Sequence, residues 1–253
     1  MIYTYDNLML NGRLGNQLWQ IAATINFARQ NHGEALFNPA WEYRDFFSVP
    51  DEYFGEYYLP QCVDGGTEYF QEYSYFEPIS DEIKSYFQPS VRALEEIEPI
   101  EGYTCSIHVR RGDYLNWPNH FPITTSHFYR SAVADIKADH PETHFVIFSD
   151  DIDWCKVHPE HFGFDDSPRT FFEGVVRPVE VRDRLGEPRD WVDLFTMMNC
   201  DRHIISNSTF AWWGAFLSDD PSPIYPSDWF RSAVPNWQNW ENAMLPEWRK
   251  FEC

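Results

Sequence analysis

Positive charge is scarce in this sequence. Its 253 residues include 19 lysines and arginines against 40 aspartates and glutamates, a formal net charge of −21. Nucleic acids and anionic membranes attract basic surfaces, so we expect neither as a partner. Four of the basic residues are lysines and the rest are arginines, the better planar, two-point partner for a phosphate or carboxylate. An anionic substrate must therefore be held by a few local arginines.

Paired cysteines and long apolar runs are also missing. The five cysteines are far apart and none forms a Cys-x-x-Cys pair, which predicts a reduced chain without a zinc site. No apolar run approaches the ~20 residues of a membrane-spanning helix. The start, MIYTYDNLML, has neither the basic region nor the apolar stretch of a signal peptide. We therefore expect a cytoplasmic protein with no membrane span.

Several catalytic fingerprints are absent. The chain contains no G-x-G-x-x-G and no G-x-x-x-x-G-K-[ST], the signatures of dinucleotide-binding and P-loop proteins. It contains no H-E-x-x-H and no G-x-S-x-G, the signatures of zinc proteases and α/β-hydrolases. The histidines show no metal-ligand spacing, and we assign no metal site.

Strands and helices are predicted to alternate in the second half of the chain. Apolar runs predict strands at 106–109, 144–150, 203–206 and 222–230, and periodicity predicts helices over 126–139, 189–200 and 209–218, the first capped by Ser126. Such alternation is typical of a doubly wound α/β protein, in which ligands bind beyond the carboxyl ends of parallel strands. A further helix is predicted over 16–30, and the acidic stretch 88–103 is a candidate interdomain connector.

The stretch HVRRGDY, residues 108–114, follows the first of these strands. Side chains alternate along a strand, so His108 and Arg110 would face one way and Arg111 the other. Arg110 would then offer its N–H groups to a diphosphate, while Arg111 pairs with Asp113 and holds the Gly112 turn rigid. The alternative is that both arginines form structural ion pairs with the many carboxylates of the chain.

GRLGNQ, residues 12–17, is predicted to be a tight turn that enters a helix. The first turn of a helix presents free N–H groups and the positive end of the helix dipole to an anion. Gly15 and Asn16 are therefore candidates for anion binding. An ordinary glycine turn explains the same pattern and is favoured on this motif alone.

Three aspartates follow the strand FVIFS: Asp150, Asp151 and Asp153. They could clamp Mg²⁺ or Mn²⁺ on a nucleotide-sugar. One of them could instead accept a hydrogen bond from a base or ribose. A third interpretation is that Asp150 or Asp151 caps the following helix.

ISNSTFAWWGAF, residues 205–216, is predicted to be a strand, a polar turn and a helix. Ser206, Asn207, Ser208 and Thr209 would place hydroxyl and N–H groups at the helix start, a natural seat for phosphate. An ordinary N-cap cluster explains one of these four residues well and the other three poorly. The two adjacent tryptophans of the helix are expected in the core.

Together these segments resemble glycosyltransferase family 11, the α-1,2-fucosyltransferases. HVRRGDY is similar to the HxRRGDY signature of that family, and GRLGNQLWQ to its N-terminal segment. YFQEYSYF (69–76), FVIFSDD (145–151) and DLFTMMNCDRHIISNSTFAWWGAFL (193–217) resemble its other blocks, in the family's order. Arg13 departs from the family's usual glycine, and residues 35–87 match poorly outside the aromatic block.

The resemblance implies a GT-B-like α/β fold, in which two Rossmann-like domains with parallel sheets face each other across a cleft. Residues 1–98 would form the acceptor-side domain and residues 99–253 the GDP-fucose-binding domain, and the last ~25 residues could pack back on the first domain. The implied enzyme is inverting, needs no metal or other cofactor, and transfers L-fucose from GDP-fucose to a glycan acceptor, at O-2 of a terminal galactose.

The resemblance also assigns roles to individual residues. His108 would lie near the guanine, Arg110 would bind the diphosphate, and Asp150 or Asp151 would approach the guanine. Asn16 would approach the fucose. The full set of binding candidates is His108, Arg110, Arg111, Gly15, Asn16, Asp150, Asp151, Ser206, Asn207, Ser208 and Thr209, with Ser206, Ser208 and Thr209 on the phosphates. The catalytic candidates are Arg110, Asn16 and Asp113; the predicted pairing of Asp113 with Arg111 argues against it as a general base, and the sequence identifies no other.

Two other functions fit particular features of the sequence. The aspartates after FVIFS fit a metal-dependent glycosyltransferase, whose turnover EDTA would abolish. The 11 tryptophans, together with the lack of an identifiable base, fit a non-catalytic glycan-binding protein on the same fold.

Overall fold

Two parallel β-sheets organise the chain in a computed structural model that describes residues 1–59, 62–64, 66, 68–164, 177–178, 189–231 and 240–253. The smaller sheet has the order β2-β1-β3, with β1 at Ile2–Thr4, β2 at Glu34–Ala35 and β3 at Cys62–Asp64. The larger has the order β6-β5-β4-β7-β8-β9. Its strands are β4 (Thr104–Val109), β5 (His144–Ser149), β6 (Arg177–Pro178), β7 (Arg202–Ile204), β8 (Ile224–Pro226) and β9 (Arg249–Phe251). The predicted α/β class with parallel sheets is confirmed.

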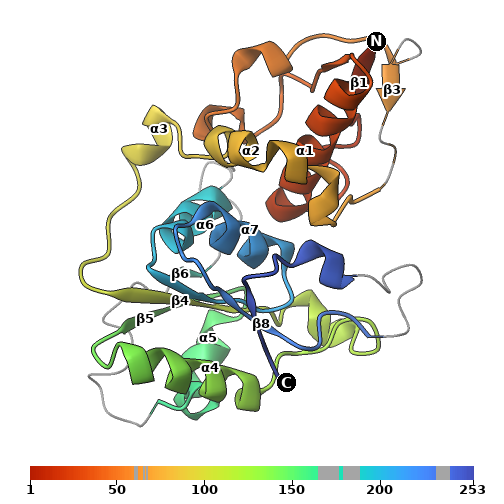
Figure 1. The fold of residues 1–253 in the computed structure, drawn as a ribbon. Helices are drawn as coiled ribbons and strands as arrows, with labels where there is room; N and C mark the ends of the chain where they lie inside the picture. Colours follow the sequence, from red (N-terminus) through yellow and green to blue (C-terminus); the bar gives the residue numbers. More distant parts are fainter. Residues whose placement is uncertain (60–61, 65, 67, 165–176, 179–188, 232–239) are drawn as a thin grey trace.

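Helices form layers on both faces of the larger sheet (Figure 1). Two of them, α4 (Ser126–Asp139) and α5 (Ile152–Val157), lie on one face, and α6 (Asp190–Met198) and α7 (Thr209–Leu217) lie on the other. The remaining helices, α1 (Leu14–Gln30), α2 (Ser80–Tyr86) and α3 (Val91–Leu94), belong to the N-terminal part. The cap predicted for α4 is one residue out, because Thr125 rather than Ser126 accepts the N–H of Phe128.

The central strand β4 is buried along its whole length. Its alternate residues Cys105, Ile107 and Val109 join a hydrophobic cluster with α4, on one face of the sheet. The residues between them turn to the other face, where His108 bonds to Ser206. Two-sided burial is typical of a strand in the middle of a parallel sheet. It places the polar end of β4 under α7 rather than in solvent.

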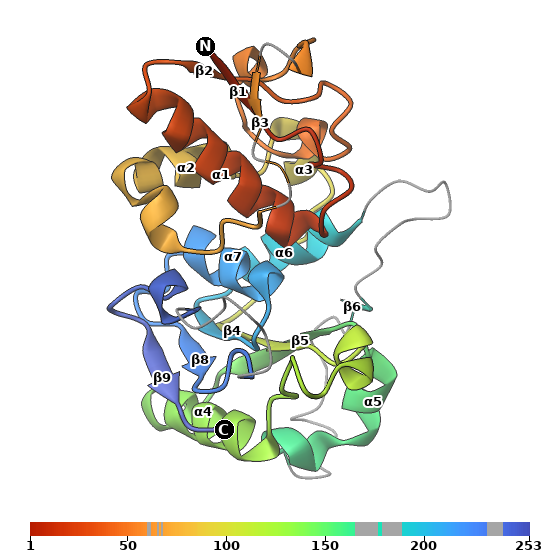
Figure 2. The ribbon, with the colours of Figure 1, turned by 90° about the vertical axis from the view of Figure 1, so that its right-hand side faces the viewer.

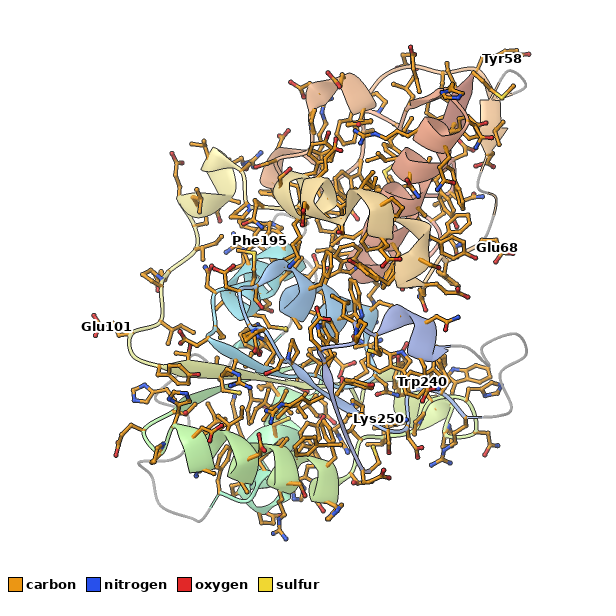
Figure 3. The ribbon with its side chains drawn as sticks, in the orientation of Figure 1. Tyr58, Glu68, Glu101, Phe195, Trp240 and Lys250 are labelled. Atoms are coloured by element: carbon orange, nitrogen blue, oxygen red, sulfur yellow. The ribbon has the colours of Figure 1, made fainter. Side chains whose placement is uncertain are left out.

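An aromatic layer joins the N-terminal part to the larger sheet. It lies where α1 approaches α6 and α7 (Figure 2). Trp19 of α1 packs against Trp212 and Trp213 of α7, with ring centroids 4.3 and 5.4 Å apart. In the same layer Phe195 of α6, labelled in Figure 3, packs on Phe47 with centroids 5.0 Å apart. Each fully buried aromatic contributes about 1.5–3 kcal/mol. The hydrophobic core therefore runs without a break from one sheet to the other, and the two tryptophans of α7 lie in it as predicted.

The C-terminal residues contact both parts of the chain. Strand β9 pairs in parallel with β8 and so extends the larger sheet. Before it, Asn242 bonds to Glu72 at 3.5 Å, and the carbonyl of Ala243 accepts a hydrogen bond from the Trp212 indole at 2.8 Å. This end of the chain thus contacts the aromatic layer at Trp212 and the N-terminal part at Glu72.

Candidate active site

Arg110 lies just beyond the end of β4 and is held from two sides. Its guanidinium pairs with Asp150 at 2.8 Å and with Asp113 at 2.5 Å, and its charge lies 5.1 Å from the centre of the Tyr114 ring. The side chain is 16% exposed. A guanidinium has five N–H groups, so the two carboxylates fix its orientation and leave N–H groups for a ligand.

Arg111 points into different surroundings. Its Nε pairs with Asp151 at 3.0 Å, and its guanidinium stacks 3.6 Å from the centre of the Trp154 ring. The predicted pairing of Arg111 with Asp113 is therefore wrong. The strand ends at Val109, before either arginine, so strand alternation does not extend to residue 113. Both arginines form ion pairs with carboxylates, as the alternative interpretation of the motif has it, but with different aspartates. The binding of Arg110 to a diphosphate stays a prediction.

Asp150 braces the turn that carries both arginines. Its Oδ1 accepts the backbone N–H groups of Arg111 and Gly112 at 2.9 and 3.2 Å, while Oδ2 pairs with Arg110. A Cβ at Gly112 would lie 2.4 Å from Asp150 Oδ2, so glycine is required for this close approach. The capping interpretation is wrong, because the N-cap of α5, Asp151, makes no side-chain cap bond.

His108 is a buried, neutral histidine at the floor of the site. It is 3% exposed, and its Nδ1 lies 2.7 Å from the hydroxyl of Ser206. Burial and the nearby charge of Arg110 lower the pKa of His108 to about 3. The Tyr129 hydroxyl donates to the His108 carbonyl at 2.9 Å, which fixes the backbone here. His108 can therefore act as a neutral hydrogen-bonding group but not as a cation near neutral pH.

The first turns of α1 and α7 meet beside these residues. Neither helix has a side-chain cap: Arg13 and Ser208 hold the N-cap positions without one. A Cβ at Gly15 would lie 2.6 Å from the backbone nitrogen of Phe210, so the absence of a side chain lets the helices touch. Two uncapped helix starts present free N–H groups and two positive dipole ends to one region, which suits an anion.

Asn16 connects the two helix starts. Its Oδ1 accepts the hydroxyl of Thr209 at 2.9 Å and the side-chain N–H of Gln71 at 2.8 Å. Asn207 performs a similar task nearby, because its side chain donates to the carbonyls of Pro122 and Trp229, both at 3.0 Å. These amides fix the loops around the site.

A pocket of about 390 Å³ lies among these groups, within the size range of small-ligand sites. Most of the predicted residues line it: Gly15, Asn16, His108, Arg110, Asp113, Asp150, Asn207, Ser208 and Thr209. Three do not: Ser206 holds His108 from behind, and Arg111 and Asp151 pair with each other. The convergence of segments from both ends of the chain makes this the candidate active site.

Other lining residues were not predicted from the sequence. They are Gly12, Arg13, Tyr69, Gln71, Tyr114, Phe121, Asp190, Phe210, Trp229 and Phe230. Several belong to motifs that were noticed, because Tyr69 and Gln71 lie in YFQEYSYF and Tyr114 ends HVRRGDY. Asp190 lies outside the sequence motifs that indicated the site. An acidic residue at a helix start is common on protein surfaces, and its burial depends on distant residues.

Metal and membrane features were sought in the part of the chain that the structure describes. No group of three or more His, Cys, Asp or Glu residues there is arranged to hold a metal ion. Of the aspartates considered for metal binding, Asp151 pairs with Arg111 and Asp153 with Lys156. No described helix combines the length and apolar character needed to cross a membrane.

Comparison with known proteins places the chain in a family. The model of the family described as Glycosyl transferase family 11 matches residues 20–252. The chain belongs to glycosyl transferase family 11. The site residues between His108 and Trp229 lie within the matched range. Gly15 and Asn16 lie before it.

Curated proteins similar to this chain come from bacteria and animals. An Escherichia coli "Alpha-1,2-colitosyltransferase" is 30% identical over 171 residues, which cover 64% of this chain and 54% of the relative. A Caenorhabditis elegans "Galactoside 2-alpha-L-fucosyltransferase" is 27% identical over 90% of this chain and 63% of its own. A human "Galactoside alpha-(1,2)-fucosyltransferase 1" is 23% identical over 94% of this chain and 72% of the human protein. The chain thus spans about half the length of the E. coli relative.

Proposed function

We propose that the protein is an inverting fucosyltransferase that moves L-fucose from GDP-fucose to a glycan acceptor, at O-2 of a terminal galactose. The observation that carries the proposal is the position of Arg110, at the end of the central strand and in one pocket with the uncapped starts of α1 and α7. A diphosphate is the ligand that this combination suits, because it offers two negative charges and many acceptor oxygens. Names of family 11 relatives support fucose and the α-1,2 linkage.

The sugar donor would lie across the pocket. Its diphosphate would bind Arg110, the hydroxyl of Ser208 and the backbone N–H of Thr209, because the Thr209 hydroxyl already donates to Asn16 and the Ser208 N–H to the Ser206 carbonyl. The guanine would lie near His108 and Asp150, and the fucose near Asn16. The neutral state of His108 favours this placement, since a neutral imidazole can bond to a base without adding charge.

The two parallel sheets support a GT-B-like arrangement. In this proposal residues 1–98 form one Rossmann-like domain and residues 99–253 the other, and the sugar donor binds mainly to the second. The pocket receives Gly15, Asn16 and Gln71 from the first of these ranges and Arg110 from the second. The aromatic layer between α1 and α7 would fix how the two domains face each other.

Catalysis would be electrostatic. As the bond between fucose C1 and the β-phosphate oxygen breaks, the sugar gains oxocarbenium character and negative charge grows on GDP. Arg110 and the helix N–H groups are already fixed where that charge develops, so little reorganisation is needed. Loss of one such group is expected to lower kcat about 10²–10³-fold.

A screen of sugar donors tests the proposal. GDP-fucose, GDP, GDP-mannose and UDP-galactose are each added in a thermal-shift measurement, and transfer to galactose-terminated acceptors is then assayed with and without EDTA. We expect stabilisation by the guanine nucleotides, since a ligand at 100 times its Kd adds about 2.7 kcal/mol, and fucosyl transfer that EDTA leaves unchanged. Stabilisation by UDP-galactose alone, or loss of turnover with EDTA, would contradict the proposal.

Colitose is the second candidate sugar. The E. coli relative at 30% identity is named a colitosyltransferase. A colitose nucleotide added to the same screen decides between the two sugars, by comparison of kcat/KM with the same acceptor.

A further inference from the structure

Among the described residues, three carboxylates line the pocket: Asp113, Asp150 and Asp190. Asp113 and Asp150 both pair with Arg110, at 2.5 and 2.8 Å. Both carboxylates are therefore engaged in holding the Arg110 guanidinium, and Asp150 uses both of its oxygens in bonds to Arg110, Arg111 and Gly112. Asp190 differs from the other two, since it makes no ion pair with Arg110.

Asp190 is the first residue of α6 and is 3% exposed. Its Oδ2 accepts a hydrogen bond from the Tyr43 hydroxyl at 3.1 Å. Its Oδ1 has no hydrogen-bond partner within the described part of the chain, although it is buried. A buried polar atom without a partner costs about 1–3 kcal/mol. A structural role at the helix start would need only the first oxygen, so the second one calls for a ligand in the pocket.

We propose that Asp190 is the general base of the transfer reaction, an inference that rests on the proposed function. The acceptor hydroxyl would donate to Oδ1 of Asp190 in the bound complex. As its oxygen forms the new bond to fucose C1, the hydroxyl proton passes to the Asp190 carboxylate. The electron pair of the broken C1–O bond leaves with GDP. The carboxyl group then returns its proton to water, which restores the carboxylate for the next turnover.

The surroundings of Asp190 suit this task. Burial raises the pKa of Asp190 to about 6, while the Tyr43 hydroxyl and the backbone N–H of Asp190 itself lower it. Of the charged groups nearby, Glu42 raises this pKa and Arg13 lowers it. A base whose pKa lies close to the working pH is both ionised and strong enough to accept a proton. Tyr43 is a positioning residue, since it holds one oxygen and leaves the other for the acceptor.

The test uses Asp190→Asn, which keeps the shape of the side chain and an oxygen for Tyr43. Transfer from GDP-fucose to a galactose-terminated acceptor is measured from pH 4.5 to 8.5, and GDP binding is measured by calorimetry. We expect kcat/KM to fall about 10²–10⁴-fold, with the Kd for GDP changed less than twofold. The wild type should show a rise in kcat/KM with pH, centred near pH 6, that the variant lacks. Asp190→Glu should recover part of the rate.

Tyr43→Phe provides a second test, the pH at which kcat/KM rises. A merely structural role of Asp190 would leave that pH unchanged. Loss of a hydrogen bond to the ionised form raises the pKa of Asp190, so the rise in kcat/KM should move to higher pH. The inference is overturned if Asp190→Asn stays within threefold of wild-type kcat/KM, or if its rise with pH persists. A wild-type protein that binds GDP but transfers no sugar would instead overturn the proposed function, and the inference with it.

Discussion

The hydroxyl of Thr209 donates a hydrogen bond to the Asn16 side chain at 2.9 Å, across 193 residues of sequence. The bond joins the first turns of α7 and α1, both of which line the pocket. The candidate site is therefore built from both ends of the chain, and its geometry depends on how tightly the two helix starts are held together.

Removal of this bond should loosen the site. In Thr209→Val the hydroxyl is lost while the shape is kept, and we expect the free energy of unfolding to fall by about 1 kcal/mol, as for a typical side-chain hydrogen bond. Affinity for GDP should fall as well, because the start of α7, which offers N–H groups to the diphosphate, is held less tightly. Urea denaturation and calorimetry measure the two effects. Thr209→Ser keeps the hydroxyl and should behave as wild type; equal losses in both variants would contradict the role of this bond.

Substitution of the two arginines should separate binding from stability. Arg110→Ala should weaken GDP binding about 10- to 100-fold, since hydrogen bonds to charged groups contribute about 1.5–3 kcal/mol. Arg111→Ala should leave Kd nearly unchanged but lower the free energy of unfolding by about 1–2 kcal/mol, because it removes the stacking on Trp154 and an ion pair. Calorimetry and urea denaturation of both variants give the comparison. Identical behaviour of the two would show that their surroundings do not set their roles.

A methyl group at Gly15 should force the helix starts apart. The added Cβ would meet backbone atoms of Thr209 and Phe210 at 2.8 and 2.6 Å, and backbone cannot move aside as a side chain can. We expect Gly15→Ala to lower the free energy of unfolding by about 1–3 kcal/mol. Gly55→Ala is the matched control, because its Cβ would meet only the flexible Leu36 side chain at 3.3 Å. A wild-type unfolding curve for Gly15→Ala would contradict the close packing.

His108 should make stability depend on pH. Its pKa is about 3 in the folded protein and about 6.5 in the unfolded chain. The stability that the neutral form contributes is therefore present above pH 6.5 and is lost as the pH falls toward 3. Between pH 7 and pH 5 the wild type should lose about 2 kcal/mol more than His108→Gln, which does not titrate. Unfolding free energies of both proteins at the two pH values check this, and parallel declines would refute it.

Periodicity and motif order predicted the larger sheet well. β4, β5, β7 and β8 all fall within or overlap the apolar runs, and α4, α6 and α7 match the predicted helices closely. Strands β1, β2, β3, β6 and β9 were not predicted, since they have two or three residues and, unlike the equally short β7 and β8, do not lie in the apolar runs. These strands form because neighbouring segments offer free N–H and C=O groups, which is a property of the assembled sheet.

For the site, the sequence alone identified which residue types stand at the strand ends and helix starts, because those positions follow from local pattern. It thereby indicated Arg110, His108 and the two helix starts, and with them an anion site. Only the tertiary structure decided which charges pair. Asp113 pairs with Arg110 and Asp151 with Arg111, because the strand ends at Val109 and its alternation does not reach the arginines. Only packing made Asp190 a buried carboxylate, through Tyr43, a residue 147 positions away. Burial and partner choice depend on contacts between distant segments, and no local pattern records them.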